Sequence, residues 1–149
     1  MSTVEIINRK ATHLYFFIQT FEAGIKLTGT EIKSIREGKA NLSDAYCAFD
    51  GQELWAYNIH ISEYDQGSYQ NHDPKRRRKL LLKKNELSKL ERKVKEKGNT
   101  IIPYRIYFNE RGFAKLEIAL AGGKKSFDKR ESLKEKDQQR ELDRTLRIK

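Results

Sequence analysis

Two neighbouring apolar runs near the end of the chain, residues 100–108 and 113–121, restrict its fold more than any other feature. In the second run, four apolar side chains fall at every second position and therefore on one face: Ala114, Leu116, Ile118 and Leu120. Such alternation is typical of an antiparallel strand with one buried face. The short polar turn between the runs ends in Gly112, as expected for a hairpin. The chain is therefore expected to build an antiparallel sheet.

Four earlier segments are also predicted to be strands, because of their aromatic, branched or alternating composition. They are residues 13–21, 25–27, 44–49 and 53–61. Asp50 and Gly51 join the last two and suit a type I′ hairpin turn. Six short strands with little sign of parallel β-α-β units predict a small closed barrel of the oligonucleotide/oligosaccharide-binding (OB) type.

Helices are expected beside these strands, so the fold class is mainly β with flanking helices. The first helix covers about residues 29–37, and Thr28 and Glu31 have the spacing of a capping box at its start. The second covers about residues 86–97, after an N-cap at Asn85. Its apolar side is expected to pack on the barrel, and its other side carries Lys89, Arg92, Lys93, Lys95 and Lys97.

An aromatic stripe lies in the predicted strand at residues 53–61. Trp55, Tyr57, Ile59 and Ile61 occupy alternate positions and would share one face. Burial in the core is the commoner use of such a stripe, although aromatic rings also stack on nucleic-acid bases. We therefore favour a packing role.

The central segment of the chain indicates what it binds. Five consecutive cations repel one another in water, so an anion or open solvent must relieve the repulsion. They are Lys75, Arg76, Arg77, Arg78 and Lys79. Three leucines, residues 80–82, follow and are expected to hold this basic run on the folded body. A bound polyanion is the favoured interpretation, and a solvated loop or a localisation-like patch is the alternative.

The net charge of +10 is unevenly distributed along the chain. Residues 75–98 carry 12 cationic and 3 anionic side chains, and residues 124–149 carry 10 and 6. The remaining residues, 1–74 and 99–123, carry 9 cationic and 12 anionic side chains, so the body is mildly acidic. This distribution predicts two separate anionic surfaces, or one long one, as partners.

The chain is expected to divide into an OB-type barrel over residues 1–123, which binds a polyanion, and a basic tail over residues 124–149. Residues 131–149 contain only four apolar residues, too few to bury a helix. On a helix, four cations would fall on one side: Lys136, Arg140, Arg144 and Arg147. The tail is therefore expected to be disordered when free and helical, with this side inward, on a polyanion.

No catalytic or metal-binding pattern is evident in the sequence. The three histidines have no carboxylate or cysteine at metal-ligand spacing, so no metal and no cofactor is expected. A phosphate-binding loop, a nucleophile elbow and a dinucleotide fingerprint are all missing, which argues against an enzyme. Cys47 is the only cysteine, which fits a reducing compartment. The sequence shows neither an apolar stretch of about 18 residues nor a charged leader, so a cytoplasmic protein is expected, and nothing calls for more than a monomer. A polybasic protein bound to a membrane surface is the alternative.

Three blocks of the chain together resemble the SmpB family, the SsrA-binding proteins of bacterial trans-translation. The blocks are residues 29–36, GTEIKSIR, residues 71–82, NHDPKRRRKLLL, and residues 122–130, GGKKSFDKR. The likeness extends from about Asn8 to the end of the chain. It implies a six-stranded OB-type barrel that holds the tRNA-like domain of transfer-messenger RNA (tmRNA, also called SsrA RNA).

The resemblance also implies ribosome rescue. Proteins of this kind support the charging of tmRNA by alanyl-tRNA synthetase and accompany it, with elongation factor Tu (EF-Tu), to the vacant A site of a stalled ribosome. The tail would then become helical in the empty message channel, with its base near the decoding centre of the small-subunit rRNA.

Matching positions carry two sets of site residues over from the family. The expected tmRNA-binding set is Asn8, Glu22, Lys33, Arg36, Asn71, His72, Asp73, Lys75, Arg76, Arg77, Arg78, Lys79 and Leu81. The expected decoding-centre set is Gly122, Gly123, Lys124, Lys125, Phe127, Asp128, Lys129, Arg130, Lys136, Arg140, Arg144 and Arg147. Leu81 would provide an apolar contact. Phe127 stands where the family often has Tyr or His, and its ring is able to stack on a base but not to donate a hydrogen bond.

Two rival interpretations stay open. A general RNA-binding barrel, such as a ribosomal protein or an RNA chaperone, would bind many RNAs alike. An RNA-modifying or RNA-cleaving enzyme would need a catalytic pocket and would show turnover.

Overall fold

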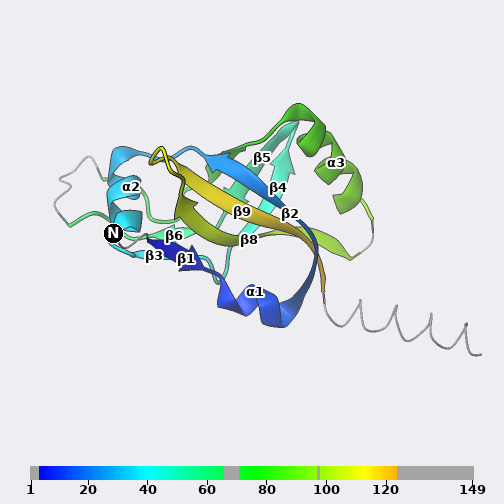
Figure 1. The fold of residues 1–149 in the computed structure, drawn as a ribbon, viewed down its shortest axis with the longest axis horizontal. Coiled ribbons are helices and arrows are strands. Elements are labelled where there is room, and N and C mark those ends of the chain that lie inside the picture. The colour runs from blue at the N-terminus through cyan, green and yellow to red at the C-terminus, as the bar shows by residue number, and fades with distance from the viewer. Residues whose placement is uncertain (1–3, 66–70, 97, 124–149) are drawn as a thin grey trace, which may run out of the picture.

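The computed structural model describes residues 4–65, 71–96 and 98–123, and within these ranges it contains three helices and nine strands. In chain order the elements are β1 (Glu5–Ile7), α1 (Arg9–Leu14), β2 (Tyr15–Ile25), α2 (Gly29–Arg36), β3 (Ala40–Asn41), β4 (Tyr46–Asp50), β5 (Glu53–Tyr57), β6 (His60–Ile61), β7 (Arg78–Leu81), α3 (Lys84–Val94), β8 (Asn99–Phe108) and β9 (Ala114–Gly123). Figure 1 shows α2 and α3 at opposite ends of the strands.

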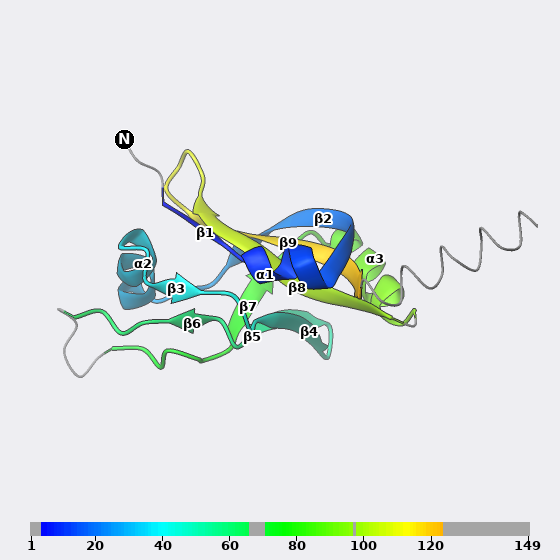
Figure 2. The ribbon, with the colours of Figure 1, turned by 90° about the horizontal axis from the view of Figure 1, so that it is seen from below.

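Six of the strands close into a ring. Their hydrogen-bonded order is β8-β4-β5-β7-β2-β9, and β9 pairs back onto β8, with every pairing antiparallel. The short β1 pairs with the end of β8, and β3 and β6 form a separate two-stranded sheet. The ring confirms the prediction of a mainly β fold built on six antiparallel strands. β4 and β5 form one wall of the ring, and β2 and β9 form the wall across from it (Figure 2).

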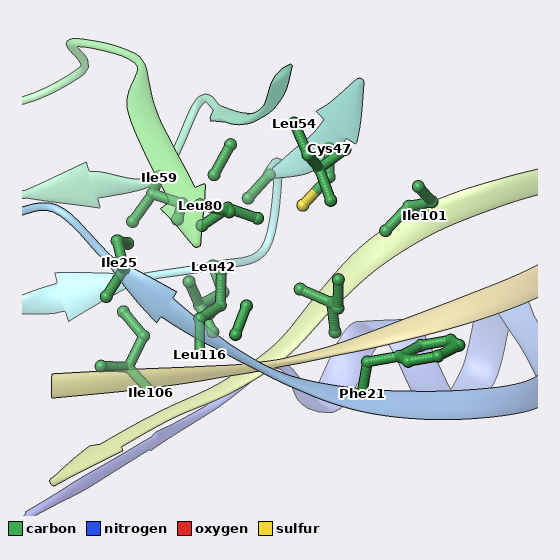
Figure 3. Packing of buried hydrophobic residues seen from close by; sticks show 14 of the residues in the cluster. Phe21, Ile25, Leu42, Cys47, Leu54, Ile59, Leu80, Ile101, Ile106 and Leu116 are labelled. Atoms are coloured by element: carbon green, nitrogen blue, oxygen red, sulfur yellow. The ribbon is translucent and has the colours of Figure 1, made fainter. Parts of the chain in front are cut away.

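An apolar core fills the ring. Leu116, Ile118 and Leu120 of β9 are at most 2% exposed, as their alternation predicts. Ile35 of α2 and Leu90 of α3 are fully buried in the same cluster, so each helix packs on the ring through one apolar side. Figure 3 shows how side chains from different strands meet in this core. Burying each such side chain stabilises the fold by about 1.5–3 kcal/mol.

The start of the chain differs from the strand predicted at residues 13–21. Residues Arg9–Leu14 form the helix α1 instead. The reason is the Asn8 side chain, which accepts a hydrogen bond from the N–H of Ala11 (3.2 Å) and so caps a helix.

One uninterrupted strand, β2, then replaces the two that the sequence predicted. It runs from Tyr15 to Ile25, so the separate strand at residues 25–27 is wrong. Gly24 does not break it, because Gly24 pairs with Leu81 of β7 and with Lys115 of β9.

The β4–β5 hairpin has a different turn from the one predicted. Its two central residues are Gly51 and Gln52, because Asp50 pairs with Glu53. Gly51 has a φ of +64°, whereas Gln52 is not among the described residues with positive φ. Glycine with positive φ at the first central position is the pattern of a type II′ turn rather than a type I′ turn.

The strand predicted at residues 53–61 ends at Tyr57. The next residue, Asn58, has a φ of +61°. This backbone conformation interrupts the strand, so the residues after Asn58 no longer share a face with those at alternate positions before it. Ile59 and Ile61 are fully buried, which confirms the core prediction for them. Trp55 and Tyr57 lie on the outer face, because the neighbouring positions of β5 point inward, and the core prediction is wrong for these two residues.

The two predicted helices are present with small changes. α2 has the predicted capping box, in which the Glu31 carboxylate accepts the N–H of Thr28 (2.8 Å). α3 starts at Lys84, so Lys83 and not Asn85 is its N-cap, and it ends at Val94 rather than near residue 97.

Candidate nucleic-acid interface

A buried ion network holds part of the basic run on α2. The Glu31 carboxylate is fully buried and accepts hydrogen bonds from Nε of Arg78 (2.7 Å) and Nε of Arg76 (3.1 Å). Arg78 is also fully buried and donates a further hydrogen bond to the carbonyl of Ile59 (2.5 Å). Burial alone would raise the pKa of Glu31, but the hydrogen bonds from Arg76 and the charge of Arg78 outweigh this effect, and the pKa lies below its ordinary value. These two arginines therefore stabilise the fold.

Two further cations of the run pair with carboxylates on the surface. Arg77 Nη1 lies 2.7 Å from Asp50 Oδ2, and Lys79 Nζ lies 3.2 Å from Glu53 Oε1. Both carboxylates come from the β4–β5 hairpin, which lies beside β7 in the ring. The mutual repulsion of the run is therefore relieved mainly inside the chain.

This pairing differs from the expectation that a bound anion or open solvent relieves the repulsion, because carboxylates of the chain relieve most of it. Arg78, one of the predicted RNA-binding residues, is fully buried in this structure, and its role in RNA binding stays a prediction. Lys75 is different, because it is exposed and no ion pair found in the described part of the chain involves it.

Asn8 and His72, two more predicted RNA-binding residues, are 3% and 7% exposed. The Asn8 amide donates to the carbonyls of Leu42 (3.1 Å) and Pro103 (3.0 Å). The ring nitrogens of His72 lie 2.9 Å from Thr30 Oγ1 and 2.9 Å from the Ile61 carbonyl. In this structure both side chains are buried and bind neighbouring segments, and their role in RNA binding stays a prediction.

Asn71 and Asp73 shape the loop that leads into the basic run. The Asn71 side chain accepts the N–H of Tyr64 (3.1 Å) and donates to the Tyr64 carbonyl (2.7 Å). Asp73 is exposed, and its carboxylate accepts the N–H of Lys75 (3.0 Å). The polar residues of this block thus hold a defined loop next to α2.

Lys33 and Arg36 lie on the exposed side of α2, as predicted. The Lys33 ammonium lies 5.5 Å from the centre of the Tyr64 ring. The Arg36 guanidinium lies 4.3 Å from the centre of the Phe108 ring and donates to the carbonyl of Gly112 (3.4 Å). Both cations are therefore fixed at one end of the ring.

A shallow depression of about 390 Å³ opens beside Leu81. It is lined by Glu22, Gly24, Leu81, Leu82, Lys83, Glu86 and Lys115. Leu81 is 46% exposed whereas Leu80 is 2% exposed, because successive side chains of a strand point to opposite faces. An added Cβ at Gly24 would lie only 3.3 Å from Leu81 Cβ, so glycine leaves room for the leucine here. The result is an exposed apolar side chain in a depression that also contains two lysines and two glutamates.

Sequence reasoning missed Lys83 and Lys115 in this Leu81 depression. Lys115 is a polar residue on the outer face of β9 and reaches the depression only because β9 pairs with Gly24 of β2. That pairing joins positions far apart in the chain, so no local pattern indicates it.

Glu22, which the family resemblance selected, borders the same depression. Its carboxylate accepts a hydrogen bond from the Tyr107 hydroxyl. Burial and this carboxylate raise the pKa of Tyr107 to about 12. A side chain of β8 therefore fixes the carboxylate of Glu22, which belongs to β2.

The predicted decoding-centre set lies mostly outside the described residues. Gly122 and Gly123 end β9, where they pair with Phe16 and Tyr15 of β2. The other predicted members are Lys124, Lys125, Phe127, Asp128, Lys129, Arg130, Lys136, Arg140, Arg144 and Arg147, and none of them falls within the part of the chain that the structure describes.

The described residues contain no group of histidine, cysteine and carboxylate side chains placed to hold a metal ion. Cys47 is buried, and burial raises the pKa of its thiol. In residues 4–65, 71–96 and 98–123, no helix is long and apolar enough to cross a membrane.

Comparisons with known proteins agree with one another. Residues 5–148 match the family model described as "SmpB protein". The SsrA-binding protein of Cytophaga hutchinsonii is 58% identical over 97% of this chain and 98% of its own length. That of Phocaeicola vulgatus is 59% identical over 97% of this chain and 96% of its own length. A chain of the solved structure "tmRNA-SmpB: a journey to the center of the bacterial ribosome" is 49% identical, with a TM-score of 0.69 over 80% of this chain and 84% of that one.

Proposed function

The chain belongs to the SmpB family, and we propose that it binds the tRNA-like domain of tmRNA and acts in ribosome rescue. As a member of this family it is an RNA-binding protein and not an enzyme. The observation that carries the proposal for the barrel is the Leu81 depression, where an exposed leucine shares one surface with the cations Lys83 and Lys115 and with the carboxylates Glu22 and Glu86.

This surface suits a folded RNA better than a flexible polyanion. Structured RNA is recognised largely by shape, through phosphates, sugars and unstacked bases. The leucine offers an apolar contact to a base or ribose, the two lysines of the depression offer charges for phosphates, and the two carboxylates are able to accept hydrogen bonds from ribose hydroxyls or base amines. Four of the five cations of the basic run pair with carboxylates of the chain, so diffuse attraction by a free cationic loop contributes little.

The remaining steps follow from the family resemblance. We propose that the chain works in the cytoplasm as a monomer, that it supports alanylation of tmRNA by alanyl-tRNA synthetase, and that it enters the ribosomal A site together with tmRNA and EF-Tu. Residues 124–149 would act afterwards at the decoding centre and in the empty message channel. The exposed cations Lys33 and Arg36 would extend the RNA-binding side of the barrel along α2.

Replacing Leu81 with glutamate is expected to weaken binding of the tRNA-like domain by about tenfold or more, because a carboxylate would then face phosphates in a partly dehydrated contact. The measurement is fluorescence anisotropy of the labelled tRNA-like domain at about 150 mM salt. The fold should tolerate the change, since Leu81 is 46% exposed.

Leu14→Glu is the matched control, because Leu14 is 49% exposed. It precedes the first residue of β2, roughly 30 Å along that strand from Gly24, and its replacement should leave the affinity unchanged. Equal losses in the two variants would mean that net charge alone governs binding. An unchanged affinity in Leu81→Glu would place the interface elsewhere.

A further inference from the structure

A second surface of the ring has the features of a nucleotide site. On the outer face of β4 and β5, the rings of Tyr46 and Tyr57 are stacked, with centres 5.3 Å apart and an angle of 14° between their planes. Beside them, the Arg77 guanidinium lies 4.0 Å from the centre of the Trp55 ring. We call Tyr46, Tyr57, Trp55 and Arg77 the aromatic platform.

The aromatic platform is held rigid by the rest of the wall. Arg77 is fixed by Asp50 (2.7 Å) and reaches the Tyr57 hydroxyl (3.4 Å). Tyr46 and Tyr57 are directly opposite each other in the antiparallel pairing of β4 and β5. Tyr46 is nevertheless 42% exposed, so its ring covers Tyr57 on one side and remains open to solvent. An exposed, immobilised ring is the form in which proteins offer a stacking surface to a base.

A polar pocket of about 410 Å³ adjoins the platform at the end of the hairpin. It is lined by Asn41, Asp44, Asn58, His60 and Lys75. Asn58 directly follows Tyr57, and Asp44 lies two residues before Tyr46, so the pocket lies near the end of the hairpin that carries the two tyrosines. The amides of Asn41 and Asn58 offer both donors and acceptors. The cation of the pocket is Lys75, whose ammonium makes no ion pair within the described ranges.

We propose that the platform and this pocket bind one unpaired RNA nucleotide. Its base stacks on the exposed face of Tyr46, the pocket amides contact the base edge or ribose, and Lys75 contacts the phosphate. Lys75 is the exposed cation of the basic run that makes no ion pair within the described ranges, so it supplies the charge for one phosphate, while Asp44 of the same pocket is able to accept a hydrogen bond from the ribose or the base edge. A base paired inside a helix presents no free face to Tyr46, so the site takes single-stranded RNA. β7 lies between this wall and β2 in the ring, so the site is distinct from the Leu81 depression and does not depend on that depression binding RNA.

The test uses the full chain and a labelled short oligoadenylate, with anisotropy for binding. Trp55 is the only tryptophan, so its emission reports directly on the platform. The oligoadenylate should bind and change the Trp55 emission, whereas a blunt RNA duplex of equal length should leave the emission unchanged. Tyr46→Leu should weaken oligoadenylate binding by about tenfold, because stacking of one base contributes about 1–3 kcal/mol, and Tyr46→Phe should bind like the original chain.

A second variant keeps the proposal testable if Tyr46→Leu is poorly folded. Lys75→Gln should reduce the slope of log affinity against log salt by about 0.7, the value for one phosphate contact on a single strand. Leu81→Glu should not alter oligoadenylate binding, which separates this site from the proposed tmRNA surface. Unchanged Trp55 emission at saturating oligoadenylate, or equal affinity in Tyr46→Leu and Tyr46→Phe, would overturn the proposal.

Discussion

A chain that ends at Gly123 is expected to bind the tRNA-like domain of tmRNA with an affinity within about threefold of the full chain, and to lose the tagging of stalled products completely. The cut preserves the barrel, because Gly123 is the last residue of β9 and pairs with Tyr15 of β2. The residues that line the Leu81 depression all precede the cut. Residues 124–149 carry 10 cationic and 6 anionic side chains, which we assign to a different partner, the ribosome.

The control for this truncation is a full-length chain in which Lys136, Arg140, Arg144 and Arg147 are replaced by glutamine. It keeps the length of the tail and removes the cations that one side of a helix would present. We expect it to bind the tRNA-like domain normally and to tag stalled products poorly. If the chain ending at Gly123 bound the tRNA-like domain more than about tenfold more weakly, the tail would belong to the tmRNA interface and the division between two partners would be wrong.

Glu31→Gln is expected to lower the free energy of unfolding by about 3–5 kcal/mol, because it leaves the buried guanidinium of Arg78 without its carboxylate. Both side chains are fully buried in the ion pair. Urea denaturation of the full chain measures the change. Glu53→Gln is the matched control, since it breaks the exposed pair with Lys79, and it should cost less than about 1 kcal/mol.

The pH dependence of stability gives an independent check on the same residue. The pKa of Glu31 is lower in the folded chain than its ordinary value of 4.5, so the unfolded chain takes up the proton first as the pH falls. The stabilisation from Glu31 is therefore complete above pH 4.5 and is lost as the pH falls through the folded-state pKa. Glu31→Gln should lose less stability over this acid range than the original chain does. Equal acid sensitivity in both chains would contradict the assignment.

The sequence predicted the strands that alternate, because alternation is a local property. The spacing of Leu116, Ile118 and Leu120 predicts one buried face of β9 even when the neighbouring strands are unknown. α1 was missed because one side chain, Asn8, caps the short segment RKATHL, which ends just before the aromatic residues of β2. Strict alternation puts Trp55 and Tyr57 on the same face as Ile59 and Ile61. The positive φ of Asn58 breaks this alternation, and the sequence pattern does not reveal that break.

The basic run shows where local reasoning fails for the site. Five consecutive cations favour an external anion as long as their neighbours in space are unknown. In the structure Glu31, Asp50 and Glu53 approach the run from α2 and from the β4–β5 hairpin. Only the ring topology brings these carboxylates there. Glu22 and Leu81, which the family resemblance selected as RNA-binding residues, line one depression in the structure, but the resemblance gave no indication of Lys83 and Lys115.

The most direct test of the account is a binding competition. The labelled tRNA-like domain of tmRNA is bound to the full chain at about 150 mM salt and challenged with an excess of bulk tRNA. We predict that the tRNA-like domain stays bound, because the Leu81 depression and the fixed loop next to α2 recognise a particular RNA shape. If the excess of bulk tRNA displaced the label as well as the same excess of unlabelled tRNA-like domain does, the claim would be wrong and the chain would be a general binder of structured RNA.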